Sequence, residues 1–549
     1  MNHLTPIEML YHWEKTTPDK VYLKQPINGV WRTWTWKQAG DEVRRMAAVL
    51  KAMNLPNNSN IAMISKNCAH WILSDLAIMM SGHVSVPMYP NLTAQSIKQI
   101  LEHSGSKVLF VGKLDDWQPM KPGVPDDVKC ISFPFYPHKE YENWEDLIKK
   151  QDPIPEDVKR DPKELATIVY TSGTTGVPKG VMHKFHNLAF AAGTAMPHLN
   201  IDNTSKFFSY LPLSHVAERL LVEMGSIYVG GEVSFAESLD TFPKNLAEAR
   251  PTVFLGVHRI WTKFQQGVLA KLPQHKLDIL LKIPVLSGLI KKKIKKGLGL
   301  IDAKNVLTGA APTPVELMEW FETIGIKIQE AYAATESCCY SHATLMNHIK
   351  IGYVGQPLPH CEVKLGDDNE ILIRHEALMD GYYKEPGITK EAFTSDGFLH
   401  TGDAGEIDRE GFLKITGRVK DIFKTSKGNY VAPSPIEMKI AGHSNVIEQV
   451  CVVGTGLPQP VALVVLSESG KKRPKERVQS KLEHTLSEIN STLDAQERLE
   501  RIVVVKNEWT VENGMLTPSM KIKRNEVEKA YSANYEKWGA QASTVVWEV

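Results

Sequence analysis

The sequence predicts an α/β protein, in which a large N-terminal part with parallel-rich sheets covered by helices precedes a small α+β part. Between residues 39 and 170, short apolar runs alternate with segments of helical spacing, and such alternation is typical of parallel sheets. In the last third of the chain, short strands follow one another between turns. Residues 417–437 lie between these short strands and are rich in Lys, Gly and Pro, so we take them as the junction to the small domain.

The individual elements follow from apolar spacing and from turn residues. Helices are predicted where apolar side chains recur at helical spacing, and strands where short apolar runs end at Gly or Pro. In chain order the predicted elements are helix 39–55, strand 60–65, helix 71–82, strand 83–90, a helix, turn and strand over 96–112, and the strands 166–170, 371–375, 412–416 and 449–454.

Composition and charge favour a globular protein that acts on small molecules. The 549 residues are 42% hydrophobic and 23% charged, which are ordinary globular values. The net charge of +1 supplies no overall field for a polyanion, so we expect no nucleic-acid partner.

Cysteine usage and the N-terminus indicate the cellular setting. The six cysteines form no CxxC pair and no metal-type spacing with His, so the sequence predicts no zinc site and fits a reducing compartment. The first residues lack a basic segment followed by an apolar core. No apolar run reaches the roughly 18 residues of a spanning helix. We therefore expect a cytoplasmic protein.

A stretch rich in glycine and hydroxyl groups, YTSGTTGVPKG at 170–180, follows the strand 166–170. Its backbone N–H groups and hydroxyls can bind an anion, and Lys179 adds a positive charge. Phosphate is the ligand that this chemistry favours. The common nucleotide pattern GxxxxGK[ST] is not met, because Pro178 precedes the lysine and Gly180 follows it.

The stretch resembles the phosphate loop of the adenylate-forming superfamily, which contains acyl-CoA synthetases, peptide-synthetase adenylation domains and firefly-type luciferases. Further strings resemble the other motifs of that superfamily and occur in its order. They are YLPLSHVAER at 210–219, LTGAAP at 307–312, QEAYAATES at 329–337, DGFLHTGD at 396–403, GRVKD at 417–421 and NGMLTPSMKIKR at 513–524.

The resemblance implies the residues that bind ATP. Tyr332 would stack on adenine, Thr335 would contact phosphate, and Asp403 would accept hydrogen bonds from the ribose hydroxyls, which Arg418 would also contact. Lys424 is similar to a nucleotide-contacting lysine of some fatty acyl relatives. The full implied set is Thr171, Ser172, Gly173, Thr174, Thr175, Gly176, Gly309, Ala310, Ala311, Glu330, Ala331, Tyr332, Thr335, Asp403, Arg418 and Lys424.

Four residues are implied to be catalytic. Lys179 would neutralise the phosphates, and Glu336 would hold Mg²⁺ through its hard carboxylate oxygens. His215 would lie beside the substrate carboxylate. Lys521 would be the lysine of the adenylation step, carried on a domain that pivots at Lys420.

The resemblance extends from about residue 17 to residue 524 and implies a domain organisation. An N-terminal AMP-binding domain would span 1–418 and include a distorted β-barrel subdomain. A small mobile α+β domain would span 419–549, with its hinge at Lys420.

The activity implied is the ATP-dependent activation of a carboxylic acid to an acyl-adenylate and then to acyl-CoA, with ATP, Mg²⁺ and coenzyme A as cofactors. The wording LPLSHVAER and LTPSMKIKR resembles the long-chain fatty acid branch. A medium-chain or aryl acid stays open, as do a luciferase-like oxygenase, a carboxylate reductase activation domain and a binding protein without catalysis. The AGHSN string at 441–445 is interpreted as structural, not as a carrier site. Ala333 replaces the glycine of most relatives, which leaves the pocket width open.

Residues 280–300 combine an apolar stretch with the lysines 291–293, 295 and 296. Three interpretations stay open. The segment could contact anionic lipid as a peripheral membrane patch, it could bind the 3′-phosphate of CoA, or it could be a solvated helix face.

Overall fold

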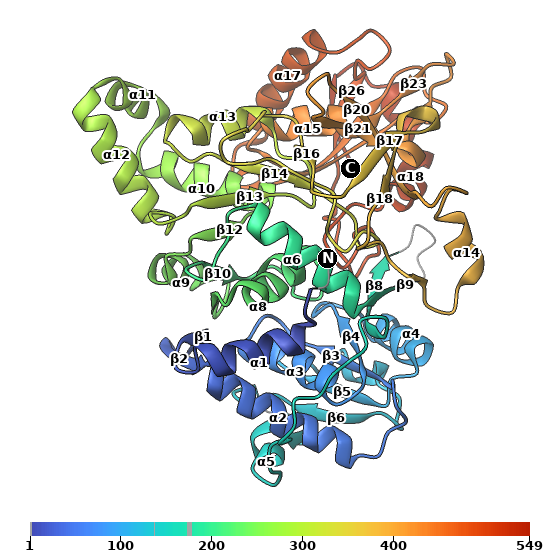
Figure 1. Cartoon of the computed structure of the whole chain (residues 1–549). Helices are drawn as coiled ribbons and strands as arrows, with labels where there is room; N and C mark the ends of the chain where they lie inside the picture. The colour runs from blue at the N-terminus through green and yellow to red at the C-terminus, as the bar shows by residue number, and fades with distance from the viewer. Residues whose placement is uncertain (1–2, 137, 173–177, 549) are drawn as a thin grey trace.

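The computed structural model describes residues 3–136, 138–172 and 178–548 (Figure 1). Two large sheets form the N-terminal part. The first has the order β19-β9-β8-β4-β3-β5-β6-β7. Its strands are β19 (Gly381–Tyr382), β9 (Pro178–Lys184), β8 (Leu165–Ser172), β4 (Val84–Met88), β3 (Asn60–Ile64), β5 (Val108–Val111), β6 (Lys129–Ser132) and β7 (Glu142–Asn143).

The second large sheet has the order β16-β15-β14-β13-β12-β10-β11-β1-β2. Its strands are β16 (Gln356–Pro357), β15 (His342–Ala343), β14 (Gln329–Tyr332), β13 (Asn305–Thr308), β12 (Val253–Leu255), β10 (Lys206–Ser209), β11 (Glu232–Phe235), β1 (Val21–Ile27) and β2 (Val30–Thr35). Both sheets are parallel in their interior and antiparallel only towards their edges.

A third sheet of the N-terminal part is antiparallel throughout. Its order is β17-β18-β20-β21. The strands are β17 (Glu362–Leu365), β18 (Glu370–Arg374), β20 (Leu399–Ile407) and β21 (Leu413–Arg418).

Helices cover the two large sheets and lie between them. They are α1 (Pro6–Thr16), α2 (Trp36–Ala52), α3 (Ala69–Met80), α4 (Ala94–Ser104), α5 (Trp144–Ile148), α6 (Phe185–His198), α7 (Val216–Glu218), α8 (Gly225–Val229), α9 (Phe242–Ala249), α10 (His258–Lys271), α11 (Gln274–Lys282), α12 (Pro284–Gly297), α13 (Val315–Thr323) and α14 (Pro386–Glu391). Short 3-10 turns span Lys121–Gly123, Asp367–Asn369 and Val419–Asp421, and a π-helical turn spans Arg219–Met224.

Helix α3 shows why the sequence packs in this way. Most of its side chains are apolar, and all of its residues are buried, as expected of a helix inside a core. It contacts β4 of the first sheet and β1 of the second. By contrast, α2 is amphipathic, and a capping box of Thr35 and Gln38 fixes its start. One apolar core therefore joins the two large sheets.

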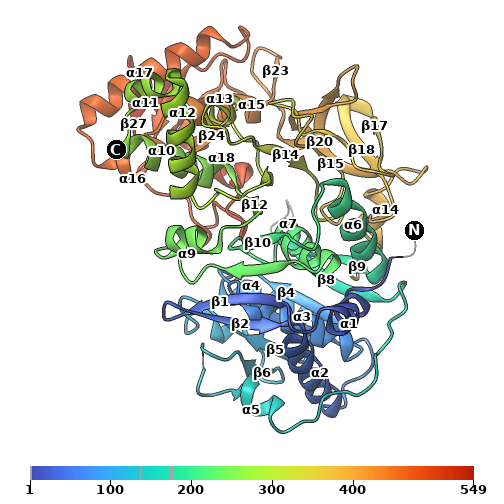
Figure 2. The same ribbon diagram turned by 60° about the vertical axis from the view of Figure 1, so that its left-hand side comes forward.

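The C-terminal elements form a separate sheet with its own core (Figure 2). The strands are the pair β22 (Phe423–Lys424) and β23 (Tyr430–Val431), and the sheet of β24 (Ile447–Val453), β25 (Val461–Leu466), β26 (Arg501–Val504) and β27 (Val545–Trp547). The helices are α15 (Pro433–His443), α16 (Glu468–Lys471), α17 (Lys475–Ser491), α18 (Arg524–Tyr531) and α19 (Tyr535–Gly539), with a 3-10 turn at Ser532–Asn534.

The α/β fold class predicted from the sequence is confirmed, and each predicted element overlaps a helix or strand of its type. One local arrangement differs from the parallel sheet that the sequence predicts, because β8 pairs with the antiparallel strand β9. Within the described residues, no helix is both long and apolar enough to cross a bilayer.

Candidate functional site

The hairpin of β8 and β9 carries the predicted phosphate loop. Thr171 pairs with Lys179 across the hairpin, and the Lys179 Nζ lies 5.4 Å from the centre of the Tyr382 ring. Four predicted loop residues and one side chain lie outside the described residues: Gly173, Thr174, Thr175, Gly176 and the side chain of Ser172.

Glu336 lies in the turn after β14 and faces the same tyrosine. The Tyr382 hydroxyl donates to the Glu336 Oε1 at 2.8 Å. Burial, and then the Glu336 charge, raise the pKa of Tyr382, so its hydroxyl stays protonated and can donate. Sequence patterns do not reveal Tyr382, because it comes from β19, 46 positions along the chain.

The neighbouring Thr335 is tied to the hairpin through its backbone. Its carbonyl oxygen accepts a hydrogen bond from the His183 Nε2 of β9 at 2.8 Å. Burial lowers the pKa of His183 to about 4, so this imidazole is neutral at physiological pH. The contact joins the first large sheet to the turn that carries Glu336.

Asp403 forms a second cluster with two residues that the resemblance places at the nucleotide. The Tyr332 hydroxyl donates to Oδ2 at 2.8 Å, and the Arg418 Nε lies 2.8 Å from Oδ1. Asp403 and Arg418 are direct partners on β20 and β21, and the Asp403 carboxylate is the main cause that raises the pKa of Arg418. An ionised carboxylate has about four lone-pair sites, so Asp403 retains acceptor capacity for a ligand.

The predicted adenine turn follows β13 at the carboxyl edge of the second sheet. A Cβ on Gly309 would lie 3.0 Å from the Ala331 carbonyl oxygen, so only glycine fits without a shift. Ala310 adopts the left-handed region with φ 64°, and Ala311 follows it half-exposed. Ligands of open α/β sheets bind outside the carboxyl ends of strands, and this turn lies at such an edge.

Two residues predicted to bind the nucleotide have their recorded contacts elsewhere. Glu330 is buried, and its Oε2 accepts from the Gly352 amide at 3.1 Å; burial raises its pKa to about 8. Lys424 is exposed and lies 5.4 Å from the Tyr430 ring centre, within the C-terminal part. A nucleotide role for these two residues stays a prediction.

Lys521 enters this region from the C-terminal part. Loss of hydration lowers the pKa of Lys521, the Arg418 charge lowers it further, and the Asp403 and Glu336 carboxylates oppose that change. Its side chain is nevertheless exposed. Lys521 therefore lies near these charged groups while its side chain stays open to water.

His215 faces the same lysine. It caps α7, where its Nδ1 accepts from the Ala217 amide at 3.2 Å, and its ring packs edge-on against Tyr89. Burial, and then the Lys521 charge, lower the pKa of His215 to about 4. The structure thus brings Lys521, His215 and the two predicted carboxylates, Asp403 and Glu336, into one electrostatic neighbourhood.

A tight loop presents Lys521. The Lys521 amide donates to the Thr517 Oγ1 at 3.0 Å, and a β-bridge joins Leu516 to Ile522. At the tip, the Pro518 carbonyl oxygen accepts a hydrogen bond of 3.0 Å from the Asn91 Nδ2 of the N-terminal part. Sequence patterns do not reveal this contact, because its partners are 427 positions apart.

A buried cluster of charged side chains contacts β8 of the hairpin. Arg219 donates to the Thr167 Oγ1 of β8 at 2.6 Å and to the Asp75 Oδ2 at 2.5 Å, and its Nε lies 3.3 Å from the Glu223 Oε2. Burial, and then the Asp75 charge, raise the pKa of Glu223 well above its usual range. Its surroundings therefore favour the protonated form of Glu223. In the sequence, Arg219 and Glu223 are the charged residues of an otherwise apolar run at 219–224, which is the pattern that could have pointed to this cluster.

The side chains at this site would bind Mg²⁺ only together with oxygen atoms of a bound ligand. Among the residues that the structure describes, no three His, Cys, Asp or Glu side chains gather as a metal centre. Glu336 offers one carboxylate. Mg²⁺ in nucleotide sites is usually bound by one or two carboxylates plus phosphate oxygens and water, so a single carboxylate beside a phosphate loop suits it.

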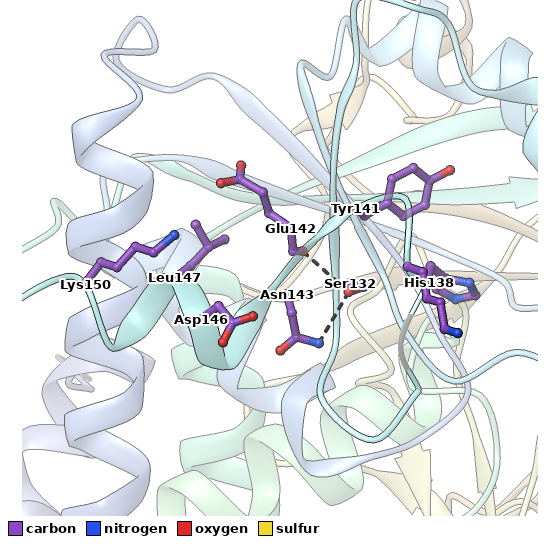
Figure 3. A pocket seen from close by; sticks show the side chains of 9 residues that line it. Ser132, His138, Tyr141, Glu142, Asn143, Asp146, Leu147 and Lys150 are labelled. Atoms are coloured by element: carbon purple, nitrogen blue, oxygen red, sulfur yellow. Dashed lines mark hydrogen bonds between the residues drawn. The ribbon is translucent and has the colours of Figure 1, made fainter.

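A separate surface cavity lies between β6, β7 and α5 (Figure 3). Ser132 links its walls, because its Oγ donates to the Glu142 carbonyl oxygen at 3.4 Å and accepts from the Asn143 Nδ2 at 3.5 Å. These elements lie at the end of the N-terminal part remote from the C-terminal sheet (Figures 1 and 2). The cavity contains none of the predicted site residues.

The two large sheets, the antiparallel sheet that carries Asp403 and the lysine loop from a separate C-terminal sheet define the fold of adenylate-forming enzymes. Comparison with known families agrees. The AMP-binding enzyme family matches residues 10–383, and the AMP-binding enzyme C-terminal domain matches residues 420–540. The chain belongs to the AMP-binding enzyme family.

Similar proteins are named as ligases of fatty acids. The chain is 27% identical to the long-chain-fatty-acid–CoA ligase FadD15 of Mycobacterium bovis, over 96% of each protein. It is 30% identical to fatty acyl-CoA synthetase A of Dictyostelium discoideum, over 92% of this chain and 85% of that protein.

Solved structures share the fold at lower identity. The anthranilate CoA ligase AuaEII in complex with anthranoyl-AMP is 19% identical, with a TM-score of 0.81 and coverage of 97% of this chain and 98% of that chain. The adenylation domain of a carboxylate reductase from Mycobacterium chelonae is 22% identical, with a TM-score of 0.82 and coverage of 98% and 91%.

Proposed function

We propose that this protein activates a carboxylic acid with ATP to an acyl-adenylate, releasing pyrophosphate, and then transfers the acyl group to the thiol of coenzyme A, releasing AMP. One observation carries the proposal most directly: Lys521 from the C-terminal part lies in the electrostatic neighbourhood of Asp403, Glu336 and His215. The names of the similar ligases support the same reaction.

Positive charge is what the first step requires. The acid and the triphosphate are both anions and repel each other, whereas the carboxylate is already the nucleophile and needs no base. Lys521 would stabilise charge on the carboxylate and the α-phosphate, and Lys179 would stabilise the outer phosphates. Preorganised donors of this kind each contribute about 2.7–4 kcal/mol to the transition state.

The nucleoside would be held by the Asp403 cluster and by the turn after β13. Asp403 would accept from the ribose hydroxyls while Arg418 and Tyr332 hold its carboxylate in place. Gly309 allows close approach of the backbone to the base. Tyr332 would stack on the base.

Glu336 would hold Mg²⁺, with its carboxylate oriented by Tyr382. Such an ion supplies charge neutralisation and alignment of the phosphates. His215 would lie beside the substrate carboxylate as a neutral group, so it would donate a hydrogen bond without adding charge.

The second step requires that Lys521 leave. We infer that an N-terminal domain of residues 1–418 stays fixed while residues 419–549 rotate about Lys420, in a rigid-body motion about a short hinge. Lys420 is exposed, and no residue of the turn Val419–Asp421 is buried. This supports the assignment, because such a turn packs little that a rotation would disrupt. The thiol of CoA would then enter from the side that Lys521 has left.

A long-chain fatty acid is the proposed substrate. The names of the similar ligases, with FadD15 at 27% identity, support it. An aryl acid is the second candidate, favoured by the fold shared with the anthranilate ligase. Transfer to a carrier group at Ser444 is disfavoured, because that serine is only 4% exposed.

The test is ATP–pyrophosphate exchange with a panel of acids, followed by acyl-CoA detection with the active ones. We expect exchange that depends on an acid, with long-chain fatty acids turned over fastest, and thioester formation when CoA is added. Absence of exchange with every acid would contradict the proposed function. Exchange with aryl acids alone would contradict the proposed substrate only.

A further inference from the structure

The helical hairpin of α11 and α12 lies at the outer edge of the N-terminal part (Figure 1). None of the residues of α12, all of which the structure describes, is buried. Five large apolar side chains on the hairpin and its joint are exposed: Ile279 (61%), Ile283 (43%), Val285 (78%), Leu286 (39%) and Leu289 (60%). We call them the apolar patch. Large apolar side chains exposed close together in the chain are a feature of interaction sites.

Lysines lie beside the apolar patch. Neither the neighbouring sequence nor the described structure provides an acidic side chain that pairs with them. No acidic residue occurs between residues 279 and 301. Among the described residues, no ion pair involves any of the six lysines of this segment: Lys282, Lys291, Lys292, Lys293, Lys295 and Lys296.

Helical geometry places both kinds of side chain on one face of α12. Residues of an α-helix are spaced by about 100°, so positions three, four and seven apart share a face. Val285, Leu286 and Leu289 therefore share a face with the exposed lysines 292, 293 and 296. Ile290 and Ile294 point the other way and pack against the core beneath. The outward face is apolar at its start and cationic at its end.

We propose that this face of α11 and α12 docks on the surface of an anionic lipid bilayer. The apolar patch at the start of α12 would enter the interface, while the lysines at its end stay at the level of the lipid phosphates. The net charge of the chain is only +1, so the attraction would come from this segment and not from the whole protein.

A free phosphate ligand explains the lysines but not the apolar patch. The 3′-phosphate of CoA would need converging cations, whereas Lys292, Lys293 and Lys296 succeed one another along a helix face. A second copy of this chain would bury the patch but would bring the same unbalanced charges together. An anionic bilayer satisfies both features of the surface.

The test is flotation of the full chain with vesicles of neutral phosphatidylcholine, with and without about one-third anionic phosphatidylglycerol, at physiological salt. We expect binding to the mixed vesicles only. Each lysine near an anionic surface contributes about a fivefold factor. The triple variant K292Q/K293Q/K296Q should therefore bind about 100-fold more weakly, and V285S/L286S/L289S should also lose binding.

Two matched variants control for charge and apolar area. K37Q/K149Q/K150Q removes three exposed lysines elsewhere, and V30S/L239S removes two exposed apolar side chains elsewhere; both should bind as the unaltered chain does. No flotation with anionic vesicles would overturn the proposal, and so would equal binding to neutral vesicles. Sedimentation that shows a dimer lost in V285S/L286S/L289S would assign the face to self-association instead. Circular dichroism of each variant verifies folding.

Discussion

Asp403 and Lys521 lie in the same region, but the structural elements that carry them differ in how firmly they are held. Asp403 lies on β20, which pairs with a strand on each side, and both of its oxygens have donors on neighbouring elements. Lys521 lies on a loop outside the C-terminal sheet. At its tip, that loop meets the N-terminal part through the hydrogen bond from Asn91 to Pro518.

Among the described residues, the second polar contact between the two parts is an ion pair, and it is also weak. Arg259 lies 3.8 Å from Glu448, and both side chains are partly exposed. Exposed ion pairs contribute about 0–1 kcal/mol, and a hydrogen bond contributes about 0.5–1.5 kcal/mol net. The comparison shows one side of the site fixed by sheet pairing, and the other held by weak polar contacts together with the packing of α15 on α13 and β21.

The largest effect is expected for Lys521→Ala. It should slow acyl-adenylate formation by about 100- to 1,000-fold, because a preorganised donor is lost, and should leave thioester formation from supplied acyl-adenylate unchanged. Single-turnover measurement of each half-reaction checks this. An equal loss of rate in both half-reactions would show that Lys521 does not act in adenylation alone.

On the fixed side, Tyr382→Phe should slow adenylation by about tenfold, since the hydrogen bond to a charged Glu336 contributes about 1.5 kcal/mol or more. Tyr383→Phe is the matched control, because the Tyr383 hydroxyl contacts Asn60 and not Glu336. The exchange rate at saturating acid is the readout. The hypothesis fails if the two variants lose activity equally.

Removal of the contact at the loop tip should have a smaller effect. Asn91→Ala should slow adenylation by about fivefold, because one exposed hydrogen bond contributes about 1 kcal/mol, without slowing thioester formation from supplied acyl-adenylate. Asn57→Ala, at an exposed position of the same part, is the control. An Asn91→Ala enzyme slowed in both steps would point to a general structural role.

The smallest effect concerns pH. Burial and Lys521 lower the pKa of His215 to about 4, so this ring should be neutral throughout the range in which an ordinary histidine titrates. His215→Gln keeps a neutral polar side chain. The ratio of unaltered to variant exchange rates should therefore stay constant, within about twofold, between pH 5.5 and 8. A ratio that changes near pH 6.5 would mean that His215 gains a proton there.

Local signals carried most of what could be predicted. Apolar spacing revealed α2, α3 and the buried strands, and the ordered motifs pointed to Asp403 and Lys521. What escaped depends on long-range pairing: Tyr382 reaches Glu336 from another sheet. Asn91 likewise meets Pro518 only in the folded chain, and neither residue type is unusual enough to reveal such a partner.

The buried cluster around Arg219 shows the same limit. An arginine in an apolar run signals a partner, but spacing alone does not reveal whether that partner is Asp75, Glu223 or a ligand. The antiparallel return of β9 escaped for a similar reason, because short strands do not encode the direction of their neighbours.

The most direct test is to lock the movable side. Asn91→Cys and Pro518→Cys would be joined by a short bismaleimide linker, in a background in which the partly exposed Cys130, Cys339 and Cys361 are serine. After removal of excess linker, the locked enzyme should form acyl-adenylate at close to the unlinked rate and should fail to transfer the acyl group to CoA. A locked enzyme that produces acyl-CoA at the unlinked rate would contradict the account, because Lys521 would then have no need to leave.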